Sequence, residues 1–191
     1  TASPGIFTNG DYLEFYGYPL DTNFTTANVY WLYWGDGPGK RVACNSGAVT
    51  GQGQAITSFY DSFRLEQNKI MFDRTPGAPQ KDYWFWQSLI APDSREYELA
   101  LPNPDSSAGN AEVKVCFRGR STPAPHPNHH TMLYVNGHLV SGKYWDNTEE
   151  LVQQASFSQQ ILQAHGNKLT IELPGDTGAS IDNIFLNWIE I

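Results

Sequence analysis

The chain has 191 residues and a formal net charge of −8, so it is long enough to bury a full hydrophobic core and is acidic overall. Its 12 Lys and Arg residues are scattered rather than clustered, which argues against a surface that follows nucleic-acid phosphates. No apolar run reaches the roughly 18 residues of a membrane-spanning helix. We therefore expect neither a nucleic-acid partner nor a membrane span.

Apolar and polar residues alternate with a period close to two through most of the chain, as is typical of β-strands. The alternation predicts strands over residues 12–16, 28–34, 56–72, 82–89, 96–101, 111–118, 130–135, 139–141, 168–173 and 181–191. Segments rich in Pro and Gly separate the strands, as at residues 75–79 and 122–127. This pattern predicts an all-β fold, a two-sheet antiparallel sandwich of the jelly-roll kind.

Asn136 and Gly137 lie between two alternating runs, where a tight hairpin turn needs positive φ at two successive residues. A hairpin is therefore predicted at this position. Two short helical segments are also predicted, over residues 148–154 and 159–165. Ser158 is placed to cap the second, and Gly166 to end it in the left-handed conformation.

Residues 181–191 are apolar on both sides of the predicted strand. Ile184, Leu186 and Trp188 would face one way, and Phe185, Ile189 and Ile191 the other. We expect this strand to be central in its sheet. Because the chain stops within or just after it, we also expect residues 1–191 to form one β-sandwich module excised from a larger protein.

The chain has two cysteines, Cys44 and Cys116, which leaves two buried thiols or one disulfide as alternatives. Cys116 lies in an alternating strand without a neighbouring His, so we interpret it as structural rather than nucleophilic. The Gly-x-Ser-x-Gly motif of serine hydrolases is absent from the sequence. The module itself is therefore expected not to be an enzyme.

A free-standing glycoside hydrolase is a further alternative, because its two carboxylates can come from any pair of strands. The acidic residues that would have to supply them are expected to be exposed singly by the alternation. They are Glu14, Glu66, Glu96, Glu98 and Glu172.

Histidines and aspartates between residues 126 and 182 are the candidates for metal binding. Zinc would use His126, His129, His130 or His138, but adjacent residues of a strand point to opposite faces. Structural calcium is a second hypothesis, and its candidate carboxylates are Asp146, Asp176 and Asp182. We expect no cofactor and no catalytic metal, with structural calcium left open.

Residues 144–146 combine two aromatic side chains with a carboxylate, in what is predicted to be a loop after the hairpin. A partly exposed ring beside a hydrogen-bonding group is how proteins hold sugar rings. The sequence therefore predicts a ligand site made by Tyr144, Trp145 and Asp146, with His129 or His130 at its edge. The alternative is that Trp145 belongs to the core.

Several motifs, taken in order, resemble a domain of large secreted gingipain-like cysteine peptidases. They are residues 12–17 (YLEFYG), 22–32 (TNFTTANVYWL), 82–86 (DYWFW), 129–130 (HH), 135–137 (VNG), 145–146 (WD), 162–167 (LQAHGN) and 185–191 (FLNWIEI). The hairpin region is also similar to the jelly-roll, galactose-binding-like domains of β-galactosidases and β-glucuronidases.

The resemblance implies a non-catalytic accessory module of such a peptidase, secreted or at the cell surface, that binds carbohydrate or another surface ligand. The peptidase uses Cys and His residues of a separate α/β domain, and this chain lacks that domain's alternating strand and helix pattern. The alternative implied function is an interaction or prodomain-like module that packs against the peptidase domain of the same chain. The expected partners are thus a glycan and that adjacent domain.

Overall fold

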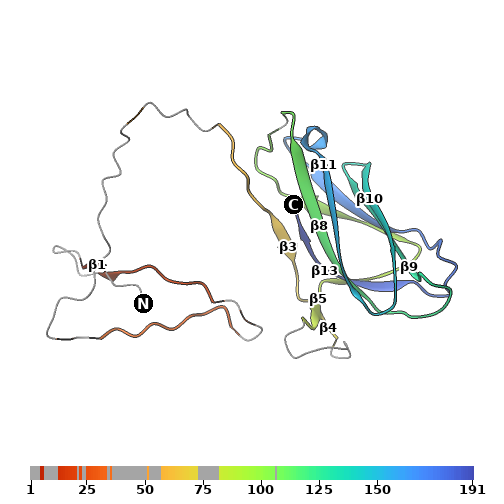
Figure 1. The fold of residues 1–191 in the computed structure, drawn as a ribbon, viewed down its shortest axis with the longest axis horizontal. Helices are drawn as coiled ribbons and strands as arrows, with labels where there is room; N and C mark the ends of the chain where they lie inside the picture. Colours follow the sequence, from red (N-terminus) through yellow and green to blue (C-terminus); the bar gives the residue numbers. More distant parts are fainter. Residues whose placement is uncertain are drawn as a thin grey trace. The chain divides into compact units, whose positions relative to one another are not determined.

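The computed structural model describes residues 5–6, 13–20, 22, 25–33, 35, 51, 57–72, 82–105 and 107–191. The chain divides into two compact units, Thr1–Ile56 and Thr57–Ile191. The two larger antiparallel sheets of the second unit form a sandwich (Figure 1). The predicted all-β sandwich is confirmed for this unit, whereas a single module over residues 1–191 stays a prediction.

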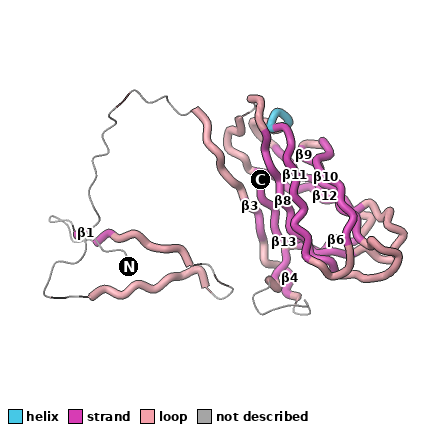
Figure 2. Tube along the Cα trace, viewed as in Figure 1, coloured by secondary structure: helices cyan, strands magenta, loops and turns pink. Residues whose placement is uncertain are grey.

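The first sheet has four strands in the order β10-β9-β12-β7. Figure 2 draws the strands in magenta and labels β9, β10 and β12 of this sheet. The strands are β7 Asp93–Leu99, β9 His129–Val135, β10 His138–Trp145 and β12 Asn167–Leu173. The second sheet has the order β11-β8-β13-β3, and β6 also pairs with β13. Its strands are β3 Arg64–Glu66, β6 Gln87–Ile90, β8 Asn110–Gly119, β11 Glu150–Ser158 and β13 Asn183–Glu190.

Alternate residues of both sheets point inward and form one hydrophobic core. On β8 these are Val113, Val115 and Phe117, and on β12 they include Leu169 and Ile171, all fully buried. Burying each such side chain contributes about 1.5–3 kcal/mol. Successive side chains of a strand point to opposite faces of the sheet. The residues between the buried ones therefore lie on the outer face of each sheet, where they can make other contacts.

Strand β13 is central, as predicted from its apolar faces. It pairs with β8 on one side and with β6 and β3 on the other. A register shift between Leu186 and Trp188 means that Ile189 rather than Trp188 joins Ile184 and Leu186 in the core, so the predicted facing of both Trp188 and Ile189 was wrong. Alternation alone does not predict such a bulge.

The outer face of β13 is covered as well. Phe185 stacks on Phe85 with ring centroids 4.7 Å apart, and Phe72 lies 5.2 Å from Phe185. Phe85 belongs to β5 (Trp84–Phe85), which pairs with β4 (Ile70–Met71). This small cluster explains why β13 carries apolar residues on both faces.

The hairpin at Asn136 and Gly137 is confirmed. Their φ angles are 49° and 81°, and Val135 pairs with His138 across the turn. The second helical prediction is confirmed in shortened form, as the 3-10 helix η1 (Gln159–Ile161) that Ser158 caps. Gly166 has the predicted left-handed φ of 71°, but it does not end the helix, because η1 ends at Ile161 and its C-cap Leu162 is extended.

The predicted helix over residues 148–154 was wrong, because β11 (Glu150–Ser158) occupies that region. Its burial alternates with period two, with Leu151, Gln153 and Phe157 inside. Gln153 reads as polar in sequence, yet its Oε1 accepts a 2.6 Å hydrogen bond from the buried Thr131 hydroxyl. A polar residue with an internal partner thus breaks the apolar pattern without leaving the core.

In the first unit, β1 (Gly5–Ile6) pairs with β2 (Leu13–Glu14). The predicted strand over residues 28–34 is not a strand over its described residues, 28–33. Within the described parts of the chain, no helix has the length and apolar character needed to cross a membrane.

Candidate functional site

The candidate site lies on the outer face of the first sheet. Residues 129, 131, 133 and 135 of β9 face the core, so His130 and Met132 face outward. On β10 the outward residues that pair with them are Tyr144, opposite His130, and Gly142, opposite Met132. The neighbouring strands β9 and β10 therefore bring four residues together on this face: His130, Met132, Gly142 and Tyr144.

Tyr144, His130 and Asp176 form a compact cluster on this face. The rings of Tyr144 and His130 stack with their centroids 3.8 Å apart and an interplanar angle of 14°. One oxygen of Asp176 lies 2.7 Å from Nδ1 of His130, and the other accepts a 3.1 Å hydrogen bond from the Tyr144 hydroxyl. Tyr144 is 51% exposed whereas His130 is 7% exposed, so the His ring supports the Tyr ring from beneath.

The charge state of the cluster follows from these contacts. Burial opposes ionisation of Asp176, but hydrogen bonds from His130 and Tyr144 lower its pKa below the ordinary value of 3.8. An ionised carboxylate only accepts hydrogen bonds, so Nδ1 of His130 carries a proton and donates it. Burial, together with the bond to Asp176, raises the pKa of Tyr144, which keeps its hydroxyl neutral.

The same face continues across β12. Glu172 lies opposite Met132, and Tyr134 places its hydroxyl 3.6 Å from the sulfur of Met132. Burial is the main cause that raises the pKa of Tyr134, and a hydrogen bond to Glu172 raises it further. A shallow open concavity adjoins Glu172; its lining residues are Pro92, Asp93, Ser94, Glu172, Leu173 and Pro174.

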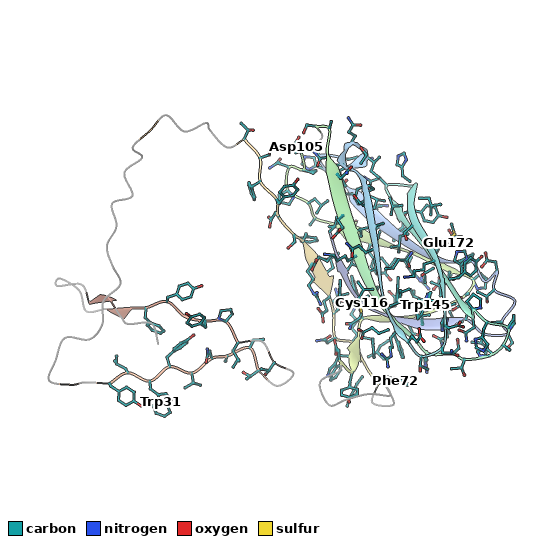
Figure 3. All side chains as sticks on the ribbon, viewed as in Figure 1. Trp31, Phe72, Asp105, Cys116, Trp145 and Glu172 are labelled. Atoms are coloured by element: carbon teal, nitrogen blue, oxygen red, sulfur yellow. The ribbon has the colours of Figure 1, made fainter. Side chains whose placement is uncertain are left out.

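Trp145 is not on this face, and the prediction that it is partly exposed was wrong. It is the last residue of β10, lies opposite His129 and is 7% exposed within the core (Figure 3). Its Nε1 donates a 3.2 Å hydrogen bond to Oγ1 of Thr131. The strand continues through the position where a loop was expected, so alternation turns Trp145 inward and Tyr144 outward.

His129 is also buried, contrary to its predicted place at the edge of a ligand site. Nδ1 lies 2.6 Å from Oδ1 of Asp182, and Nε2 lies 2.8 Å from the carbonyl oxygen of Asn147. A carbonyl oxygen only accepts, so Nε2 is the donor. Gly119 permits this packing, because a Cβ there would lie 1.7 Å from the Asn147 oxygen. Both His129 nitrogens are engaged internally.

Asp146 makes a separate pair with His126. Its Oδ1 lies 2.7 Å from Nδ1 of His126 and accepts a 3.1 Å hydrogen bond from the backbone N–H of Asn128. The hydrogen bond from His126 is the main cause that lowers the pKa of Asp146. The structure thus gives Asp146 a role in ordering the loop at residues 126–128.

Each of the three carboxylates considered for calcium has its own His partner. Asp146 pairs with His126, Asp176 with His130, and Asp182 with His129. Among the described residues, no three acidic, His or Cys side chains converge as metal ligands.

From the sequence, Asp176 was considered only as a calcium ligand, and its contacts with His130 and Tyr144 were not predicted. The pairing of His130 with Tyr144 was also not predictable from the turn. A regular ladder from the hairpin would put His130 opposite Lys143, but a register shift between Leu139 and Ser141 moves it to Tyr144. The alternating pattern carries no signal for that shift.

Cys116 lies in the sandwich as a free, buried thiol. Burial raises its pKa to about 12, so the reactive thiolate form is disfavoured at neutral pH. The structure therefore supports the interpretation of Cys116 as structural. Cys44 lies outside the described residues.

No family model matches the chain, and no curated protein matches it. Among solved structures, dimeric latent PorU from Porphyromonas gingivalis matches with 14% identity and a TM-score of 0.46, over 74% of this chain and 14% of that chain. The carbohydrate-binding module CBM36, in complex with calcium and xylotriose, matches with 13% identity and a TM-score of 0.39, over 68% of this chain and 98% of that module.

A family 35 carbohydrate-binding module from an environmental isolate matches with 14% identity and a TM-score of 0.35, over 65% of this chain and 92% of that module. The chain thus spans 14% of the length of PorU and most of the length of the two modules. The likeness to all three is one of fold.

Proposed function

We propose that the sandwich is a non-catalytic module that binds a glycan on the outer face of the β10-β9-β12-β7 sheet. The observation that carries the proposal is the half-exposed Tyr144 ring, which His130 supports from beneath and Asp176 holds at its hydroxyl. A fixed aromatic plane beside a carboxylate supplies both the apolar surface for a sugar ring and the acceptor for its hydroxyl groups.

The cluster is ordered before any ligand arrives. The stacked ring and the hydrogen bond to Asp176 restrict the rotation of Tyr144, so little side-chain entropy remains to be lost on binding. Sites on isolated modules are usually weak, and dissociation constants from roughly micromolar to millimolar are expected.

The non-catalytic part of the proposal rests on the thiol and on the sequence motifs. Cys116 is buried, and its pKa is raised to about 12 by burial, so it is not available as a nucleophile. The resemblance of the motifs to a domain of gingipain-like cysteine peptidases makes such a secreted enzyme the proposed parent of the module. An adjacent peptidase domain is then the proposed second partner.

The test is a glycan array followed by affinity electrophoresis on the glycans that bind. Tyr144→Ala should abolish binding while the melting temperature changes little, because half of the ring is already exposed. Trp84→Ala is the matched control, since Trp84 is 43% exposed and lies on β5. The proposal fails if the wild-type chain binds no glycan, or if the two variants bind equally well.

A second candidate function is docking against another domain of the parent protein. Exposed aromatic side chains in the described part of residues 1–56 favour it, among them Tyr16, Tyr18, Trp31 and Tyr33, which are 62–83% exposed. A surface of this kind is typical of a face that a partner covers. Replacing Trp31 and Tyr33 by Ser in the parent protein should then weaken the protection of residues 25–33 from proteolysis, without affecting glycan binding.

A further inference from the structure

Gly142 leaves open backbone between two outward side chains of β9. Gly142 is exposed, and a Cβ at this position would lie 3.8 Å from Nε2 of His130 and 4.0 Å from Cγ of Met132. These are ordinary contact distances, so a small side chain would fit there without displacing either neighbour. We call the exposed backbone of Gly142, with His130, Met132 and Tyr144 around it, the Gly142 site.

Nε2 of His130 is the polar atom that faces the Gly142 site. It has no hydrogen-bond partner within the part of the chain that the structure describes, although the residue is 93% buried. Among the described side chains, Oδ1 of Asn187 is the one fully buried N or O atom without a hydrogen-bond partner. Nε2 of His130 is therefore not fully buried, and solvent reaches it.

The tautomer of His130 determines what Nε2 offers to a ligand. Asp176 is held ionised by its hydrogen bonds, so Nδ1 of His130 must carry the proton that joins them. In the neutral imidazole the other nitrogen, Nε2, is then an acceptor. It therefore suits a ligand group that donates a hydrogen bond, such as a sugar hydroxyl.

We infer that the Gly142 site is the specificity subsite of the module and that it takes an uncharged sugar residue. In this arrangement the sugar lies against the Tyr144 ring and the Met132 side chain, and one hydroxyl donates to Nε2 of His130. The absence of a side chain at Gly142 gives that hydroxyl access. The inference rests on the proposed function, because it assigns the glycan class for the same face.

Charge around the site selects against acidic glycans. Asp176 lies on one side of His130, and Glu172 lies opposite Met132 on β12. Both carboxylates would repel the carboxylate of a uronic or sialic acid and the groups of a sulfated sugar. The chain as a whole adds to this repulsion with its net charge of −8.

Titration calorimetry with cellohexaose, xylohexaose, mannohexaose and an oligogalacturonate tests the inference. The wild-type chain should bind at least one neutral oligosaccharide and should bind the oligogalacturonate at least about tenfold more weakly. Gly142→Val should weaken the neutral ligand at least about tenfold, because the side chain covers Nε2. Thr170→Val, on the neighbouring strand β12, is the control for adding Val to this sheet and should bind normally.

Two substitutions of His130 separate its role in binding from its role in packing. His130→Asn keeps an amide near the Nδ1 position for Asp176 but has nothing at the Nε2 position. His130→Gln reaches the Nε2 position with its amide. Both variants lose the ring and should lose similar stability, whereas the Gln variant should retain more affinity for the neutral oligosaccharide than the Asn variant.

The outcomes distinguish this inference from the proposed function. If no glycan binds, both are overturned. If a glycan binds in a Tyr144-dependent way but Gly142→Val binds as well as the wild type, the subsite is wrong and the proposed function stands. The subsite is also wrong, and the proposed function again stands, if the acidic ligand binds as tightly as the neutral ones. A ¹⁵N NMR spectrum in which the neutral His130 is protonated at Nε2 instead of Nδ1 leads to the same conclusion.

Discussion

Nδ1 of His129 lies 2.6 Å from Oδ1 of Asp182, and both side chains are buried. The other oxygen of Asp182 accepts a hydrogen bond from the backbone N–H of His130. This pair therefore ties the start of β9 to the segment that leads into β13. It also sets the backbone position from which His130 reaches the outer face.

Asp182→Ala should lower the free energy of unfolding by about 3–5 kcal/mol, because it leaves a buried imidazole and a backbone N–H without their acceptor. Urea denaturation followed by Trp fluorescence measures the change. Asp61→Ala, at an exposed position, should leave the midpoint unchanged. An unaltered urea midpoint for Asp182→Ala would show that the His129–Asp182 pair contributes nothing to the stability of the fold.

Trp145→Ala should destabilise the sandwich by about 3–5 kcal/mol, because Trp145 packs against Phe117 and His129 in the core. The same denaturation experiment applies, with Trp84→Ala as the exposed counterpart and an expected loss of less than about 1 kcal/mol. Equal losses in the two variants would argue that Trp145 is not a core residue.

Two glycine substitutions should differ sharply. A Cβ at Gly119 would lie 1.7 Å from the Asn147 carbonyl oxygen, so Gly119→Ala must displace the backbone that His129 contacts. At Gly142 the nearest atoms are at least 3.8 Å away, and Gly142→Ala should fold normally. Melting temperatures by calorimetry decide the matter, and a Gly119→Ala protein as stable as the Gly142→Ala protein contradicts the described packing.

Cys116 should react slowly with iodoacetamide at neutral pH in the folded protein and rapidly in denaturant. The cause is burial, which raises the pKa of the thiol to about 12. Peptide mass spectrometry separates its labelling from that of Cys44. Cys116→Ala should alter stability and no catalytic turnover. Rapid stoichiometric labelling of the folded chain at Cys116 would falsify this prediction.

The stability contributed by Asp176 should depend on pH in the acid range. Its folded pKa lies below the ordinary value of 3.8, so its contribution is complete above that value and is lost as the pH falls through the folded pKa. The Asp176→Asn protein should therefore be slightly less stable than the wild type at pH 7, and the difference should shrink as the pH falls below 3.8 and vanish below the folded pKa of Asp176. The effect is small because the carboxylate is 46% exposed. If the difference in stability between the Asp176→Asn protein and the wild type persists at pH 2, it arises from packing rather than from the charge of Asp176.

The parts of the fold that follow from local chemistry could be predicted from the sequence. Asn136 and Gly137 supply the positive φ angles of the hairpin, and the apolar pattern around Phe185 places β13 at the centre of its sheet. The strand β11 could not be recognised, since Gln153 is buried through a bond to Thr131 that only the assembled sheets provide. Its polar character made a helix the easier interpretation.

The residues predicted to form one ligand site are divided between two faces of the sheet in the structure. Tyr144 and His130 are brought together on one face, whereas Trp145 and His129 are turned into the core on the other. The difference arises because β10 extends to Trp145 and because a register shift precedes Ser141. Pairing Asp176 with His130 depends on contacts between distant segments, for which the sequence carries no local signal.

The most direct test of the glycan-binding face is an NMR titration of the ¹⁵N-labelled chain with the neutral oligosaccharide that binds best. We predict that chemical-shift changes centre on His130, Met132, Gly142 and Tyr144, with smaller changes at Asp176. Changes confined to the described residues of the first unit, or to the concavity at Pro92 and Pro174, would contradict the account, as would an unperturbed spectrum at millimolar ligand concentration.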